Sequence, residues 1–169
     1  KIEDTVVAQL AGEQRKLYLA NQDRIAQQVQ HREASEFKKD KLKVLAELTK
    51  LRQICCDPRL HYEDYKAGSA KLDTCMELVH GALDGGHRIL LFSQFTGMLD
   101  IIGKRLAKED IAFLKLTGAS SKESRAKMVA QFQAGEVPVF LISLKAGGVG
   151  LNLTAADVVI HYDPWWNVA

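Results

Sequence analysis

The stretch Leu141–Thr154, LISLKAGGVGLNLT, joins an apolar run to a hydroxyl, a lysine and three closely spaced glycines. The apolar run, which begins two residues earlier at Val139 and continues to Ile142, is typical of a buried strand. Glycines let backbone N–H groups turn toward an anion, and Lys145 adds a point charge that suits phosphate. The stretch therefore predicts a phosphate-contacting loop after a strand. A simple glycine turn between two strands fits the same residues.

A second apolar run, Val158–Ile160, ends in polar and aromatic residues, HYDPWWN at 161–167. In an open α/β sheet, ligands bind in the crevice beyond the carboxyl ends of the strands. Both polar clusters follow the ends of predicted strands. We therefore expect them to lie at one edge of a sheet.

The segment from residue 70 onward shows apolar periodicities that alternate between helix and strand. Ser69 and Ser121 are predicted helix caps, and Gly135 a helix end. Short connections between such elements imply right-handed βαβ units and a parallel sheet with helices on both faces. The predicted helices are 70–83, 95–108 and 122–134, and the predicted strands are 88–92, 111–116, 139–143 and 157–162.

The segment before residue 68 has a different character. Residues 13–36 and 40–56 have helical periodicity, and the pair Asp57-Pro58 ends the second helix because proline disfavours helix in the residue before it. Residues 5–10 fit a short strand. The predicted organisation is a helical lead-in over 1–68 and an α/β lobe over 69–169.

Composition excludes several classes of protein. A net charge of +2 is too small to establish a nucleic-acid partner by itself. Three cysteines, two of them adjacent, give neither a disulfide framework nor metal-ligand spacing, and we predict no metal site. No apolar run approaches membrane-spanning length, so we expect no membrane partner and a cytoplasmic location, nucleoid-associated if the source is bacterial.

Five segments in order resemble Swi/Snf-type helicase-like ATPases. The residues 143–156, SLKAGGVGLNLTAA, with DPWWN at 163–167, resemble motif V and its extension. ILLFSQF at 89–95 resembles motif IV, and LTG at 116–118 resembles the segment between them. LRQICCDP at 51–58 and SAKL at 69–72 resemble the lead-in to the second lobe. The resemblance implies a three-layer α/β/α RecA-like lobe with a mainly parallel sheet, preceded by a helical lead-in.

The resemblance also implies double-stranded DNA as a partner, held by its phosphates without regard to sequence. Hydroxyls, lysines and backbone N–H groups are the usual phosphate contacts. The hydroxyls at these strand ends could equally serve as helix caps or loop hydrogen-bond donors. The predicted DNA-binding residues are Ser93, Gln94, Thr117, Gly118, Ser143, Lys145, Ala146, Gly147, Gly148 and Trp166.

Two of these assignments depend on details of the motif. The resemblance places Gly150, Leu151 and Asn152 near a bound nucleotide, although Asn152 alone also fits an Asx turn. Trp166 precedes Asn as in the family, and an exposed indole can stack on a base. Trp165 cannot point the same way in an extended segment. The family usually has proline where this chain has Val168.

The elements of an ATP motor are incomplete in this sequence. A phosphate-binding loop of the form GxxxxGK[ST] is absent, and no Asp-Glu pair is present to hold magnesium. No arginine follows Arg125, so the resemblance implies that the lobe over 69–169 is incomplete at its C-terminus and lacks the family's arginine-finger motif. We expect ATP and Mg²⁺ to bind in the parent protein, mainly to a missing first RecA-like lobe, and neither to bind this piece alone. The parent is expected to be a DNA-dependent ATPase, and this piece alone is expected to be inactive.

Two other functions fit parts of the sequence. Gly147–Gly150 could belong to a Rossmann-like nucleotide- or cofactor-binding domain, but that fingerprint should open a helix after the first strand. The helices before residue 57 could instead make the chain a non-catalytic protein-interaction module. Tight binding of a dinucleotide would favour the first alternative, and a partner captured through residues 1–60 would favour the second.

Overall fold

The computed structural model describes residues 2–30, 41–147 and 151–163. The chain forms two compact units, Lys1–Thr74 and Cys75–Ala169. The division between them falls inside one helix, whereas the division predicted from the sequence stands at 68/69. The two units are described separately below.

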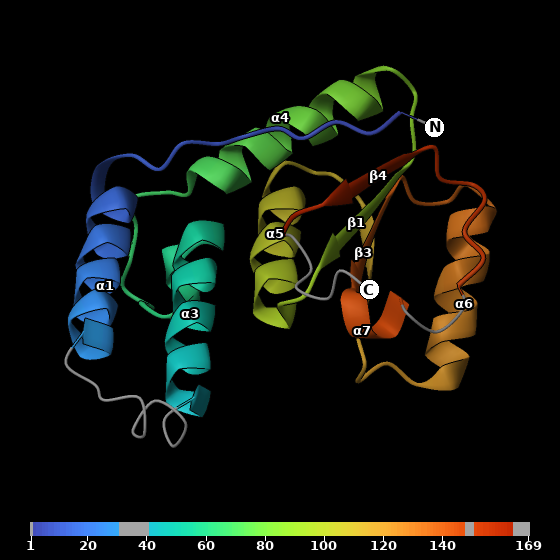
Figure 1. The fold of residues 1–169 in the computed structure, drawn as a ribbon. Coiled ribbons are helices and arrows are strands. Elements are labelled where there is room, and N and C mark those ends of the chain that lie inside the picture. Colours follow the sequence, from blue (N-terminus) through green and yellow to red (C-terminus); the bar gives the residue numbers. More distant parts are fainter. Residues whose placement is uncertain (1, 31–40, 148–150, 164–169) are drawn as a thin grey trace. The chain divides into compact units, whose positions relative to one another are not determined.

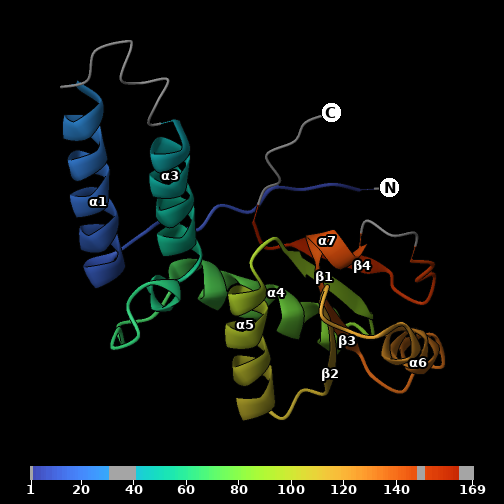
Figure 2. The same ribbon diagram turned by 90° about the horizontal axis from the view of Figure 1, so that it is seen from below.

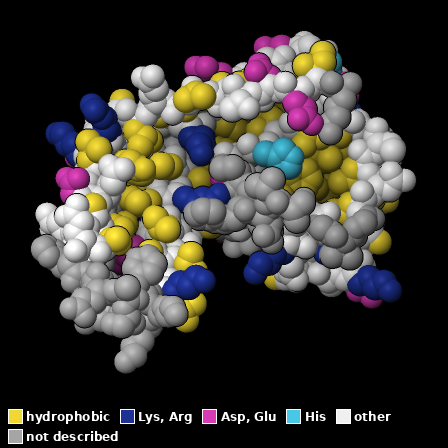
Figure 3. Space-filling view, in the orientation of Figure 1, with side chains coloured by type: hydrophobic (Ala, Val, Ile, Leu, Met, Phe, Trp, Pro, Cys, Tyr) yellow, Lys and Arg dark blue, Asp and Glu magenta, His cyan; other side chains and the backbone are white. Residues whose placement is uncertain are grey.

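Two helices, α1 (Gly12–Gln30) and α3 (Lys41–Cys56), dominate the first unit (Figure 1). They pack side by side, and Arg24 of α1 forms an ion pair with Glu47 of α3 at 2.5 Å. The short 3₁₀ helix η1 (Pro58–Leu60) follows α3, because Asp57 and Pro58 end the helix as predicted. On the face in Figure 3, hydrophobic side chains are visible over both helices, whose exposed apolar residues include Leu42 and Leu45.

The short strand predicted at 5–10 is wrong. Residues 2–11 form neither helix nor strand, and Val7 is 79% exposed. A strand needs a neighbour to satisfy its backbone N–H and C=O groups. No described strand pairs with this segment, and alternation in the sequence cannot supply that partner.

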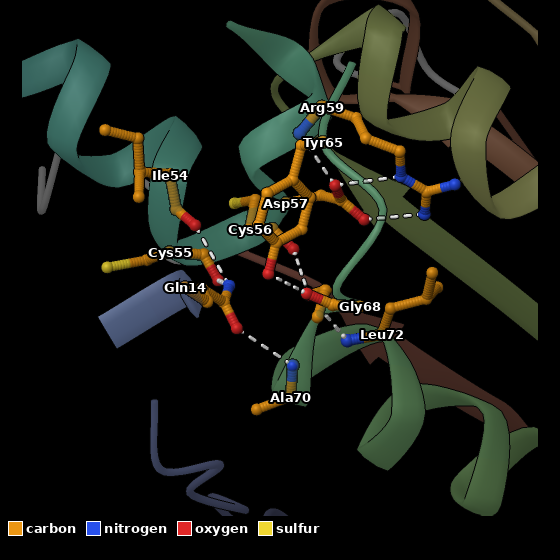
Figure 4. Close-up of polar contacts among 11 residues, drawn as sticks. Gln14, Ile54, Cys55, Cys56, Asp57, Arg59, Tyr65, Gly68, Ala70 and Leu72 are labelled. Atoms are coloured by element: carbon orange, nitrogen blue, oxygen red, sulfur yellow. Dashed lines mark hydrogen bonds and ion pairs between the residues drawn. The ribbon is translucent and has the colours of Figure 1, made fainter. Parts of the chain in front are cut away.

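A polar joint holds the first unit together (Figure 4). The Gln14 side-chain amide donates to the carbonyl of Ile54 at 3.0 Å and accepts from the backbone N–H of Ala70 at 3.0 Å. Ser69 Oγ donates to the carbonyl of Cys56 at 2.7 Å. Gln14 and Ser69 are both buried, so water does not reach these groups readily. Their bonds therefore pair backbone groups at the end of α3 and the start of α4 that would otherwise lack a partner.

Helix α4 (Ala70–Asp84) begins where the sequence predicts. The Ser69 hydroxyl accepts from the N–H of Leu72 at 3.3 Å, which is the bond expected of a helix N-cap. On the same helix Cys75, Met76 and Val79 are buried, consistent with the predicted apolar face.

The second unit contains a parallel sheet of four strands, in the order β2-β3-β1-β4. All three strand pairs are parallel. Helices α5 (Thr96–Lys108) and α6 (Lys122–Gln133) lie on opposite faces of the sheet (Figures 1 and 2). The predicted α/β/α arrangement with a parallel sheet is confirmed. The strands are β1 (Ile89–Ser93), β2 (Phe113–Leu116), β3 (Val139–Ser143) and β4 (Val158–His161).

Strand alternation divides the core between the two faces. Leu90, Phe140 and Ile142 pack with Phe132 of α6. On the other face α5 approaches closely, since a Cβ added to Gly103 would lie 3.0 Å from Phe113 Cζ. Each helix therefore covers one apolar face of the same sheet.

The buried thiol of Cys75 gives a direct test of this packing. Burial raises the pKa of Cys75 to about 12 from an ordinary value of 9.0. At pH 8 the thiolate fraction of Cys75 should therefore be about a thousandfold lower than that of a cysteine with the ordinary pKa. The thiolate is the reactive form of cysteine. We expect Cys75 to resist a disulfide reagent such as DTNB in the native protein, while Cys55, which is half-buried, reacts sooner. Equal rates at the two cysteines would contradict the packing of α4.

Candidate nucleic-acid interface

The carboxyl ends of all four strands lie at one edge of the sheet. Ser93 of β1 is paired with Ser143 of β3, and Phe92 is paired with His161 of β4. On the other side, Leu116 of β2 pairs with Ile142, so Thr117 follows at the level of Ser143. The predicted convergence of the strand ends is confirmed.

A pocket of about 520 Å³ opens at this edge. It brings together five of the residues predicted from the sequence, which come from three different strand ends. It also includes four residues that the sequence analysis missed. The pocket is lined by Gln94, Thr117, Gly118, Ser143 and Lys145, and by the additional residues Thr96, Asp100, Lys115 and Ala119.

A turn after β3 presents Lys145. The predicted glycine loop begins with one helical turn, α7 (Leu144–Gly147), and its remaining glycines, Gly148 and Gly150, lie outside the described residues. Ser143 Oγ accepts from the N–H of Ala146 at 3.3 Å, and the Ala146 side chain is buried in the core. Lys145 is exposed and, among the described acidic residues, has no ion-pair partner. The turn thus presents the Lys145 ammonium group to the pocket while Ala146 anchors it, and Ser143, which is 3% exposed, lines the pocket at the base of the turn.

Gly147 is explained by packing. A Cβ at this position would lie 2.8 Å from Phe92 Cε1, closer than real side chains approach. The Phe92 ring in turn stacks on His161, with centroids 5.3 Å apart. A glycine is therefore required for α7 to reach the sheet, independently of any anion.

The turn after β2 is built around Thr117. Its N–H donates to Ser120 Oγ at 3.1 Å, and its own Oγ1 accepts from the N–H of Ala119 at 3.3 Å. Both Gly118 and Ala119 are exposed. These bonds fix the turn and leave its outer surface open to the pocket.

The end of β1 is held by Asp163, a residue that the sequence analysis did not place in the site. Ser93 Oγ donates to one carboxylate oxygen of Asp163 at 2.5 Å, and the Gln94 N–H donates to the other at 3.0 Å. Both Ser93 and Asp163 are buried. Ser93 therefore acts on the pocket through Gln94, which lies at the surface beside it.

The residues predicted to approach a nucleotide are only partly described. Leu151 packs against the apolar cluster around Phe132, and Asn152 is exposed. Gly148, Gly150 and Trp166 lie outside the described residues.

Charge in the pocket is mixed. Lys115 and Asp100 form an ion pair across it, and Lys145 adds a further positive charge. Residues 94, 96, 117 and 143 contribute uncharged polar side chains. Strand alternation in β2 places Lys115 on an exposed face, and helix periodicity places Asp100 one turn after Thr96. These two periodicities could have located both residues from the sequence.

Within the described ranges, no group of His, Cys, Asp and Glu side chains could hold a metal ion. A search of the described helices found none with the length and apolar character needed to cross a membrane.

The sequence matches known proteins over its full length. Residues 70–169 match the helicase conserved C-terminal domain. The putative ATP-dependent helicase/translocase YwqA of Bacillus subtilis is 36% identical over all of this chain, which spans 19% of that protein. An uncharacterised ATP-dependent helicase of Mycoplasma pneumoniae is 35% identical over all of this chain and 16% of its own length. The chain therefore spans less than a fifth of the length of these relatives.

Solved structures agree with the sequence matches. The C-terminal domain of the Sulfolobus solfataricus SWI2/SNF2 ATPase is 35% identical, with a TM-score of 0.85 over 96% of this chain and 72% of that one. The core of the same ATPase in complex with double-stranded DNA is 32% identical, with a TM-score of 0.83 over 95% of this chain and 34% of that one. The shared fold, the matched domain and the motif residues at one sheet edge lead to one assignment: this chain belongs to the SWI2/SNF2 family of helicase-like ATPases and corresponds to its C-terminal RecA-like lobe.

Proposed function

We propose that the chain is the second motor lobe of an ATP-dependent translocase on double-stranded DNA, and that the pocket at the strand ends binds the DNA backbone. The observation that carries the proposal is the convergence of three strand ends, with Thr117, Ser143 and Lys145, on one pocket. Contacts to phosphate position a protein on DNA without reading its sequence. The DNA-bound structure of the Sulfolobus relative supports duplex DNA as the partner.

The pocket offers three kinds of phosphate contact. Lys145 supplies a charge, and Thr117 and Ser143 supply hydroxyls that already accept one bond each and can still donate their own hydrogen. Gly118 leaves room for a phosphate to approach the backbone. Ser93 contributes indirectly, since with Asp163 it fixes the N–H of Gln94.

ATP and Mg²⁺ would be held mainly by the first lobe of the parent protein. From this chain, Asn152 is exposed and its amide suits a ribose hydroxyl or a phosphate. Leu151 would contribute only backbone atoms, because its side chain packs in the core. In the parent, ATP bound between the lobes would supply the energy for movement along the duplex, and this lobe would hold the DNA during each step.

Replacing Lys145 with Ala tests the DNA proposal. We expect the affinity for a short duplex to fall by about threefold to tenfold at low salt, and by the same factor for unrelated sequences. The slope of log K against log salt concentration should fall by about 0.9, the value for one phosphate contact. Fluorescence anisotropy over a salt series measures both quantities.

Lys108→Ala is the matched control, because Lys108 is an exposed lysine at the far end of α5. This substitution removes the same charge as Lys145→Ala. Its position is about 12 Å along α5 from Asp100, the last residue of that helix to line the pocket. An equal loss of affinity in both variants would show that only the net charge matters and would contradict binding by Lys145 in the pocket. A loss confined to one DNA sequence would indicate base recognition and contradict backbone binding.

A further inference from the structure

The ion pair between Lys115 and Asp100 needs an explanation of its own. Both residues line the pocket, Lys115 from β2 and Asp100 from α5. A carboxylate repels phosphate, so its presence in a site for the DNA backbone opposes binding. Either the pair serves only to tie α5 to β2, or the two groups change partners when DNA binds.

The exposure of the pair argues against a purely structural role. The side chain of Lys115 is 40% exposed and that of Asp100 is 55% exposed. Ion pairs this open to water contribute little to stability, since solvent screens them. The contact between α5 and β2 is already made by close packing of Gly103 against Phe113. A weak pair inside a pocket is well suited to exchange one partner for another anion.

The surroundings of Lys115 favour phosphate as that anion. Lys145 lines the same pocket, and so do the hydroxyl-bearing residues Thr96 and Thr117. A phosphate in this pocket would meet two lysines and one carboxylate. Breaking the pair releases one lysine to the phosphate and leaves the exposed carboxylate to water.

We propose that Lys115 is a second phosphate-binding cation of this pocket and that Asp100 restrains it, so that a DNA phosphate must displace the Asp100 carboxylate to bind. This inference rests on the proposed function and adds a residue, Asp100, that sets the affinity of the pocket for DNA. Asp100 lowers the affinity for DNA by competing for Lys115. Such competition would suit a motor lobe that has to release the backbone after each step.

Asp100→Asn is the first test, on the whole chain with a short blunt-ended duplex as the probe. The substitution keeps the shape of the side chain and removes its charge, so Lys115 is released. We expect the duplex to bind more tightly, by at most about fivefold, which is the limit that a weak ion pair sets. Unchanged affinity would overturn the proposal.

Asp110→Asn is the matched control. Asp110 is exposed, lies just past the C-terminal end of α5 and has φ 58, a conformation that Asn adopts readily. It changes the net charge by the same amount about 15 Å along the helix from Asp100. We expect Asp110→Asn to change affinity much less than Asp100→Asn, and an equal gain in both would overturn the proposal.

A double variant separates release of Lys115 from simple removal of a repelling charge. Asp100→Asn with Lys115→Met should lose the gain, and its salt slope should be about 0.9 lower than that of Asp100→Asn alone. If the double variant keeps both the gain and the slope, Lys115 does not contact phosphate and the inference is wrong.

Failure of the inference can be told apart from failure of the proposed function. If Lys145→Ala weakens binding while Asp100→Asn changes nothing, the pocket binds DNA without Lys115. If the chain does not bind the duplex and Lys145→Ala has no effect, the proposed function itself fails. Far-UV circular dichroism of each variant shows that the comparison is made between folded proteins.

Discussion

Replacing Phe132 with Ala should lower the free energy of unfolding by about 3–5 kcal/mol, the usual cost of deleting a large buried side chain. Phe132 is fully buried on α6. Its ring lies 5.4 Å from that of Phe140 on β3, and the Arg88 guanidinium lies over it at 4.1 Å. The substitution would therefore leave a cavity at the junction of α6 with the sheet. Urea unfolding followed by circular dichroism measures the change.

Phe113→Ala is a suitable comparison, because it makes the same substitution at a half-buried position of β2. Its cost should be clearly smaller, since less apolar surface is lost and water can enter the space. A Phe132→Ala variant as stable as Phe113→Ala would contradict the described core.

Replacing Asp163 with Ala should lower the free energy of unfolding by about 1–3 kcal/mol, because one buried and one partly buried donor lose their acceptor. These donors are the hydroxyl of Ser93 and the N–H of Gln94. Water cannot readily replace the carboxylate, which is 3% exposed. The same change should weaken DNA binding, since Gln94 lines the pocket. Urea unfolding and anisotropy test the two effects independently.

Asp157→Ala is the matched control, because Asp157 holds the opposite end of β1 in a similar way. Its carboxylate accepts from His87 Nδ1 at 2.6 Å and from the N–H of Arg88 at 2.7 Å, but its side chain is 53% exposed. Water can replace it there, so the loss should be smaller and DNA binding should not change. Equal losses at the two positions would show that burial of Asp163 is not what makes it important.

The contribution of Asp157 to the stability of the folded chain should depend on pH. The hydrogen bond from His87, followed by that from the Arg88 N–H, lowers the pKa of Asp157 below its usual 3.8. A lowered pKa means that the folded state prefers the carboxylate, so its contribution is present above pH 3.8 and is lost as the pH falls through the lowered value. The difference between the native chain and Asp157→Ala should therefore disappear only in strong acid.

Many of the helices and strands follow from local sequence. The apolar runs before Ser93 and Ser143 predict buried strands, and the Ser69 and Ser121 hydroxyls predict helix starts that the structure confirms. Such signals are readable because a strand or a helix start depends on residues only a few positions apart. The family resemblance rests on motifs of the same short range.

Other features of the site could not be read in this way. The predicted glycine loop after β3 begins instead with the turn α7, whose Ala146 is held by contacts with the distant core. The bond between Ser93 and Asp163 joins residues 70 positions apart, and nothing near either residue indicates the other. The pairing of Asp100 with Lys115 likewise requires α5 to lie on the sheet.

By itself the sequence determined which segments form strands and helices, that the strands run parallel, and which family the motifs resemble, since each depends on local periodicity or short spacing. Tertiary structure alone decided that the strand order is β2-β3-β1-β4, that Asp163 holds the end of β1, and that Asp100 and Lys115 meet inside the pocket. These contacts arise because packing brings distant side chains together, and their energies depend on burial and distance rather than on spacing along the chain.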